Sequence, residues 1–183
     1  ESLNWGLLEF SLPNKSTIRL ADIIDTKITD DSSLWWSEDR KNHLYEQMSI
    51  NHKLALNKML QGSIFSYGTV YRRMRKGKSM AELRTDGFAG CLRTPKGGSS
   101  KQIVIRAGKG EWSVRLLTPR EYARLQGVRD SFLLPSNVNK GYFAMGDAVC
   151  VPVIEFISEN ILDKIYKEYI KEYAFDIQAE TIE

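Results

Sequence analysis

Two segments near the middle of the 183-residue sequence combine cationic with small polar side chains. In residues 72–79, three Arg and two Lys occur close together, and a guanidinium group suits phosphates and the O6/N7 edge of guanine. In residues 93–102, a Gly-Gly pair allows close backbone approach, and neutral hydrogen-bonding groups surround it. The candidate contact residues are Arg72, Arg73, Arg75, Lys76, Lys78, Arg93, Thr94, Lys96, Gly97, Gly98, Ser99, Ser100, Lys101 and Gln102.

The charge of the chain is strongly uneven along its length. Residues 62–129 hold 15 Lys and Arg against 4 Asp and Glu, whereas residues 1–61 hold 7 against 9 and residues 130–183 hold 4 against 10. A basic middle third between acidic flanks indicates contact with a polyanion. Two alternatives stay open at this point: a solvated basic surface without a partner, and a flexible hairpin tip for the Gly-Gly segment.

The sequence offers little catalytic chemistry. The two cysteines, Cys91 and Cys150, form no C-x-x-C pair, and we interpret Cys91 as packed rather than nucleophilic. His43 and His52 lack partners at metal-ligand spacing, so no metal site is expected. We find no phosphate-binding loop and no Ser/His/Asp set, and we assign no catalytic residue. Two free thiols favour a reducing, cytoplasmic location.

Membrane and export signals are not expected either. No apolar run reaches the roughly 18 residues of a membrane span, and the N-terminus does not read as a signal peptide. The Trp35-Trp36 pair has two interpretations: it anchors a loop on a core, or it stacks on bases.

The element pattern predicts an α+β fold: a small, irregular β-rich region with long loops and flanking helices. A helix is expected over residues 37–60, with a possible break near 49–51, and strands over 64–71, 103–106 and 112–117. Residues 107–111 read as a hairpin loop, and residues 72–79 and 93–102 as polar loops. Thr118, Pro119 and Glu121 form an N-cap, N1 and capping-box pattern for a helix that ends at Gly127. A last helix begins near Val151.

Three stretches together resemble the C-terminal part of DNA cytosine-5 methyltransferases. The segment RLLTPREYARLQGV (residues 115–128) is similar to the R-x-L-T-x-R-E-x-x-R-x-x-G-F pattern of their ninth motif. The segment GDAV (residues 146–149), which precedes a helix, is similar to their tenth motif, usually G-N-S/A-V. The segment DGFAGCLRT (residues 86–94), with the Gly-Gly pair after it, is similar to the end of their target recognition domain.

The resemblance implies a fragment of a two-domain, Rossmann-type methyltransferase. Residues 1–61 would be a connector and helix, residues 62–129 the target recognition region that ends in the ninth-motif helix, and residues 130–183 the tenth motif and a C-terminal helix docking on the catalytic domain. That domain would bind S-adenosylmethionine and supply a Pro-Cys nucleophile that attacks C6 of a flipped cytosine. This sequence has neither the F-x-G-x-G cofactor loop nor a Cys that follows Pro.

Residue roles follow from the resemblance. The two polar loops would lie in the major groove of double-stranded DNA. The tenth-motif residues Gly146, Asp147, Ala148 and Val149 would close over the methionine end of S-adenosylmethionine, with Asp147 where Asn is usual. The ninth-motif helix, capped by Thr118, would be structural, through buried ion pairs of Arg115, Arg120, Glu121 and Arg124.

The expected function is DNA target recognition and completion of the cofactor pocket for a site-specific methyltransferase of a restriction-modification system. The expected partners are DNA and an N-terminal catalytic half or subunit, which Val153, Ile157 and Ile161 of the last helix would contact. Two alternatives are a stand-alone DNA-binding or regulatory module without catalysis, and a scaffold that binds no nucleic acid.

Overall fold

The computed structural model describes residues 10–95, 100–168 and 170. The chain divides into two compact units, residues 17–148 and a second unit formed by residues up to 16 together with those from 149 onward. The first unit holds a mixed set of helices around one antiparallel sheet, so the fold is α+β, as the sequence predicted. All of the candidate contact residues that the structure describes belong to this unit.

The sheet has four strands in the order β2-β1-β3-β4, and each neighbouring pair is antiparallel. Its strands are β1 (Ser66–Arg75), β2 (Lys78–Arg84), β3 (Ile103–Gly108) and β4 (Glu111–Leu116). The predicted hairpin loop between β3 and β4 is confirmed, because only Lys109 and Gly110 connect them. Both connecting residues have positive φ, which two-residue hairpin turns require.

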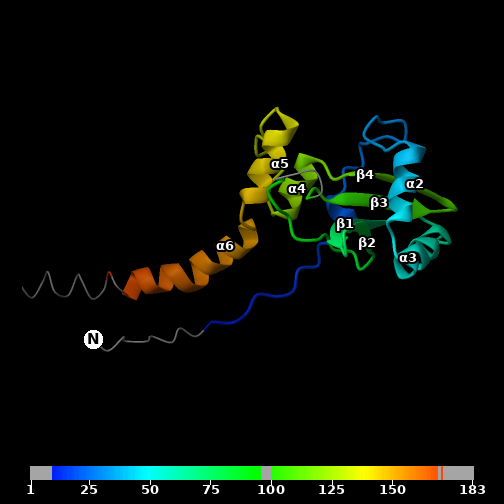
Figure 1. Ribbon diagram of the computed structural model, residues 1–183. Coiled ribbons are helices and arrows are strands. Elements are labelled where there is room, and N and C mark those ends of the chain that lie inside the picture. Colours follow the sequence, from blue (N-terminus) through cyan, green and yellow to red (C-terminus); the bar gives the residue numbers. More distant parts are fainter. Residues whose placement is uncertain (1–9, 96–99, 169, 171–183) are drawn as a thin grey trace, which may run out of the picture. The chain divides into compact units, whose positions relative to one another are not determined.

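Helices cover both faces of the sheet (Figure 1). On one face, α2 (Glu38–Glu46) and α3 (Ile50–Leu60) pack Leu44 and Leu56 against Val70, Ile105 and Val114. On the other face, α1 (Leu20–Ile23), α4 (Pro119–Leu125) and α5 (Val138–Asp147) form a second core around Val104. The sheet is therefore buried between two apolar clusters, which fixes its position and register.

The predicted helix over residues 37–60 is two helices, and the break near residues 49–51 is confirmed. Met48 lies between α2 and α3 and forms an isolated parallel bridge with Ala81 of β2. The backbone N–H of Ala81 donates to the carbonyl of Gln47 over 2.9 Å. This contact covers the outer edge of β2, which would otherwise expose unpaired backbone groups.

One predicted loop was wrong, and one helix was not predicted. Residues 72–79 are not a loop: they are the end of β1, a tight turn and the start of β2, a strand that the sequence did not reveal. Residues 138–147 form α5, for which the sequence analysis gave no helix. The side chain of Asn137 caps this helix by accepting from the N–H of Lys140.

The second unit contains α6 (Val151–Ile157) and a π-helical turn, η1 (Ser158–Leu162). The predicted start of the last helix near Val151 is confirmed. Several large apolar side chains of this unit are exposed, including Val153, Ile154 and Ile165 at 48–50%. Phe10 and Phe156 stack edge to face, with ring centroids 5.9 Å apart.

One helical stretch in the described part of the chain, Val138–Glu168, is long and apolar enough to cross a membrane by length and composition alone. Core helices of soluble proteins pass the same criterion. Non-helical residues 148–150 also interrupt this stretch between α5 and α6. The stretch is therefore weak evidence for a membrane span.

Candidate nucleic-acid interface

The hairpin of β1 and β2 turns at Lys76 and Gly77, whose φ angles are 48° and 75°. Two successive left-handed residues make the kind of turn that matches the twist of paired strands. The strands stay in register up to the turn, where Arg75 pairs with Lys78. Because side chains alternate along a strand, Arg73 and Arg75 lie on one face of the hairpin and Arg72 on the other.

Glu82 of β2 sits between two arginines of β1. Its Oε2 lies 3.3 Å from Nε of Arg73, and its Oε1 lies 3.2 Å from Nη2 of Arg75. Both arginine side chains remain more than half exposed, at 53% and 60%. One carboxylate therefore holds two accessible guanidinium groups side by side and balances only part of their charge.

Tyr71 is the aromatic centre of this surface. The guanidinium of Arg73 lies 5.0 Å from its ring centroid, and that of Arg93 lies 5.8 Å away. Arg93 thus joins the hairpin arginines across a shallow pocket of about 420 Å³ that these residues line. We call Tyr71, Arg73, Arg75, Glu82 and Arg93 the arginine cluster.

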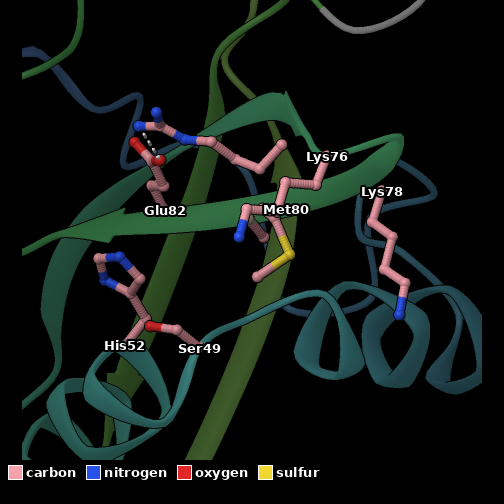
Figure 2. Close-up of a pocket in the computed structure, with 8 residues that line it drawn as sticks. Ser49, His52, Lys76, Lys78, Met80 and Glu82 are labelled. Atoms are coloured by element: carbon pink, nitrogen blue, oxygen red, sulfur yellow. Dashed lines mark hydrogen bonds and ion pairs between the residues drawn. The ribbon is translucent and has the colours of Figure 1, made fainter.

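A larger cavity of about 640 Å³ lies beside the hairpin turn (Figure 2). Ser49 and His52 of the α3 region form one wall, and Lys76, Lys78 and Met80 extend from the hairpin. Arg75 also lines this cavity, and its ion pair with Glu82 is dashed in the figure. The basic turn is therefore accessible from more than one side.

Arg72 also lines the shallow pocket of the arginine cluster. Its half-buried side chain has a lowered pKa, first because burial removes water and second because Arg40 of α2 is close. Arg40 stacks on Trp36, with its guanidinium 3.8 Å from the ring centroid. Arg72 therefore lines the pocket of the arginine cluster and also lies near Arg40 of α2.

The second basic segment is divided among several environments. Lys96, Gly97, Gly98 and Ser99 lie outside the described residues, and Ser100 is half-buried. Lys101 donates from Nζ to Asn139 over 3.0 Å and lies over the ring of Tyr142. It therefore contacts α5 rather than the arginine cluster.

The prediction that Gln102 contacts DNA needs correction. Its side chain is only 1% exposed, and its amide donates to the carbonyl of Cys91 over 3.2 Å. Its backbone N–H donates to the hydroxyl of Tyr122 over 2.6 Å. A residue enclosed in this way cannot reach a base edge, because the core separates it from solvent.

The start of the second basic segment lies against the C-terminal end of α5. The hydroxyl of Thr94 donates to Oδ1 of Asp147. Gly146 lies so close to the backbone of residues 93 and 94 that an added Cβ would come within 2.7 Å of it. The structure thus brings Arg93 and Thr94, predicted to contact DNA, next to the first two residues of the predicted cofactor motif.

The rest of that motif is held differently. The carbonyl of Ala148 accepts from Nε2 of Gln126 over 3.1 Å, and the same amide donates to the carbonyl of Met145. Asp147 is exposed. Val149 is the first residue of the second unit and is 63% exposed.

The ninth-motif residues support α4 from within. Thr118 and Glu121 form the predicted capping box, and both oxygens of Glu121 accept from Arg115, over 2.6 and 2.7 Å. This ion pair is fully buried. Arg124 pairs with Asp130 near the surface, whereas Arg120 donates to the carbonyls of residues 129 and 132. Of the predicted ion pairs of this motif, only Arg115–Glu121 is buried, and the prediction was wrong for Arg120 and Arg124.

Two tyrosines connect α4, α5 and the strands. Burial raises the pKa of Tyr122 to about 12, and it also raises the pKa of Tyr142. The Tyr142 hydroxyl donates to the carbonyl of Leu117 over 2.5 Å. The sequence reading did not single out Tyr71, Glu82 or Tyr142, since each lies in an ordinary strand or helix pattern.

Neither the cysteines nor the potential metal ligands form a second candidate site among the residues that the structure describes. Cys91 is exposed, so the expectation that it is packed was wrong, and Cys150 is half-buried. No group of three or more His, Cys, Asp or Glu side chains that could hold a metal occurs in residues 10–95, 100–168 and 170.

Comparison with known proteins points to one family. The family model described as C-5 cytosine-specific DNA methylase matches residues 4–163. The type II methyltransferase M.SsoII of Shigella sonnei is 29% identical over 160 residues, which are 85% of this chain and 35% of its own length. M.HpaII of Haemophilus parainfluenzae is 41% identical over 56 residues, 31% of this chain and 16% of its own length. M.NlaX of Neisseria lactamica is 49% identical over 62 residues, 34% of this chain and 19% of its own length. The chain therefore spans about a third or less of these relatives.

Proposed function

Because this chain belongs to the C-5 cytosine-specific DNA methylase family, we propose that it reads the target DNA for a site-specific cytosine-5 methyltransferase. S-adenosylmethionine would supply the methyl group for cytosine C5. Neither Cys91, which follows Gly90, nor Cys150, which follows Val149, has the Pro-Cys context of the nucleophile that the resemblance implies. The nucleophile and most of the Rossmann-type cofactor site would belong to a separate catalytic part, and both parts would work in the cytoplasm.

The arginine cluster is the observation that carries this proposal. Arg73, Arg75 and Arg93 surround Tyr71, and the first two are more than half exposed. Guanidinium groups bind phosphates and guanine edges in two-point geometry, and an aromatic ring offers a stacking face. Lys76 and Lys78 extend the positive surface to the tip of the hairpin. Such a surface suits the major groove of a duplex.

Glu82 has a defined part in this proposal. In free protein it holds Arg73 and Arg75 in place, which lowers the entropy lost when these side chains meet DNA. A carboxylate also repels phosphates, so Glu82 would weaken binding to DNA that offers only backbone contacts. The chain would therefore bind DNA in which the arginines also contact a base edge more tightly than DNA that offers backbone contacts alone.

The proposed cofactor contact fits the amino group at the methionine end of S-adenosylmethionine. The residues that would make it are Gly146, Asp147, Ala148 and Val149. The carboxylate of Asp147 is exposed and accepts one hydrogen bond, from Thr94, so it has acceptor capacity left for the ammonium group. The same charge would repel the carboxylate of the methionine part. Asp147 would therefore orient the amino group and leave the carboxylate to the catalytic part.

The first test measures binding of the 183-residue chain to labelled duplex DNA by fluorescence anisotropy. Replacing Arg73 and Arg75 by Ala should weaken binding at least tenfold and lower the salt slope by about two, one unit for each lost phosphate contact. Replacing exposed Arg129 and Lys58 by Ala removes the same charge elsewhere and serves as the control. Equal loss in both pairs would reject the arginine cluster as the DNA-binding surface.

The second test asks for the chemical step. The chain is combined with the N-terminal catalytic half of a family member, and methyl transfer from labelled S-adenosylmethionine to duplex DNA is followed. We expect cytosine C5 methylation only when both parts are present. A reconstituted pair that binds DNA and leaves cytosine unmodified would favour the alternative, a DNA-binding module without catalysis.

A further inference from the structure

A cleft separate from the arginine cluster lies where residues 33–40 meet Lys101 and α5. Its volume is about 450 Å³, and its walls include Trp35, Trp36, Arg40, Lys101, Thr118 and Tyr142. None of the residues that line it is acidic. We call it the Trp36–Lys101 cleft. Nothing in the family resemblance assigns these walls a role as a group.

The cations of the cleft lie over aromatic rings. The guanidinium of Arg40 is 3.8 Å from the ring centroid of Trp36, and Nζ of Lys101 is 4.4 Å from that of Tyr142. Neither cation forms an ion pair with a carboxylate in the part of the chain that the structure describes. Tyr142 is buried, at 4% exposure, whereas Trp36 is half-buried. The half-buried indole and the two cations therefore form the surface that accepts both a planar ring and an anion.

The aromatic walls are held in place by the fold. The backbone N–H of Trp36 donates to the carbonyl of Val114 in β4 over 2.8 Å. The indole N–H of Trp35 donates to the carbonyl of Thr29 over 3.0 Å. The hydroxyl of Tyr142 donates a hydrogen bond to the carbonyl of Leu117, and its ring stacks edge to face on Tyr122. Ordering these walls on binding therefore costs little entropy.

An excess of positive charge reaches the cleft from the sheet. Arg40, in its wall, is close enough to Arg72 of β1 to lower the pKa of that residue, although burial of Arg72 is the larger cause. Two nearby cations repel each other, so an anion bound beside them relieves that repulsion.

We propose that the Trp36–Lys101 cleft holds one nucleotide of the DNA strand that flanks the recognition sequence. Its phosphate would lie between Arg40 and Lys101, and its sugar and base against Trp36. This inference rests on the proposed function. Lys101 belongs to the segment predicted to contact DNA, residues 93–102, and the structure places it in the same cleft as Arg40. A nucleic-acid strand fits this combination of aromatic faces and cations without any acid.

The test uses the 183-residue chain and a labelled duplex whose flanks extend beyond the recognition sequence. Arg40→Ala should weaken binding about eightfold at 0.1 M salt and reduce the salt slope by about 0.9, the value for one lost phosphate contact. Arg40→Lys keeps the charge and should restore the slope, which a merely structural effect would not do. Arg129→Ala, with an exposed arginine outside the cleft, is the matched control.

Stacking is tested separately by indole fluorescence. DNA should quench the fluorescence of the unsubstituted chain, and Trp36→Phe should lose part of that quenching while binding persists. If Arg40→Ala behaves as Arg129→Ala while the Arg73/Arg75 double variant loses binding, the cleft proposal is wrong and the proposed function stands. If Arg40→Ala weakens only association with the catalytic half, the occupant is protein and the proposal is also wrong. Failure of the unsubstituted chain to bind DNA would overturn both.

Discussion

Glu121 is a fully buried carboxylate that four hydrogen-bond donors surround. Two come from the guanidinium of Arg115, at 2.6 and 2.7 Å, one from the N–H of Thr118 and one from the N–H of Asp25. The side chain thereby joins the end of β4, the start of α4 and the segment after α1. A buried charge is tolerated in the core only with such complete pairing.

We predict that Glu121→Gln lowers the free energy of unfolding by about 3–5 kcal/mol, because it leaves Arg115 as an uncompensated buried charge. Urea denaturation followed by circular dichroism measures this change. Glu111→Gln, at an exposed position, should change stability by less than about 0.5 kcal/mol. A loss below 1 kcal/mol for Glu121→Gln would contradict the structural role assigned to the ion pair.

At the scale of elements, the arrangement depends on close contact between α5 and the backbone of residues 93–94. Gly146 allows this approach because it has no side chain, and Gly141 likewise packs against Pro119, where an added Cβ would come within 2.9 Å. Two glycines in ten residues disfavour a helix locally. The helix forms because its packing on α4 buries Tyr142 and Met145.

Gly146→Ala should destabilise the protein by about 1–3 kcal/mol, since the new Cβ collides with backbone rather than with a flexible side chain. Thermal unfolding measures the effect as a lower Tm. Ala144→Ser, at an exposed position of the same helix, should leave Tm within a degree or two. An unchanged Tm in Gly146→Ala would show that the segment at residues 93–94 shifts freely away from α5.

At the scale of the whole molecule, the second unit carries several large exposed apolar side chains. Val153, Ile154, Leu162 and Ile165 are each about half exposed, whereas Ile157 and Ile161, also predicted for this contact, are half-buried. The curated relatives are much longer than this chain, so a catalytic part offers a natural occupant for this surface. We propose that this surface docks on the catalytic half, as the resemblance implies for the C-terminal helix.

Ile154→Glu combined with Ile165→Glu should weaken association with the catalytic half at least tenfold, because each variant places a charge in an apolar contact. Sedimentation velocity of a mixture of this chain and the catalytic half measures the association. Lys164→Ala, exposed on the same unit, should have little effect, and DNA binding by the chain alone should not change. Association that survives the double substitution would assign the docking surface elsewhere.

Local patterns alone determined much of this protein. The capping box at Thr118, the hairpin at Lys109-Gly110, the break between α2 and α3 and the family motifs could all be read from neighbouring residues, because caps and turns depend on short-range bonds. The sequence also indicated the basic middle third. It did not reveal β2, because Met80, Ala81, Glu82 and Leu83 are residue types that favour helices, and only Ala81 and Leu83 of this short strand are buried.

Only the tertiary structure decided which cations act together. Strand register brings Glu82 to Arg73 and Arg75, and a long-range contact adds Arg93. Packing buries Gln102, and it places Lys101 with Arg40 and the tryptophans rather than in the arginine cluster. Contacts of this kind depend on how sheets and helices stack, and the spacing of residues along one chain does not specify that stacking.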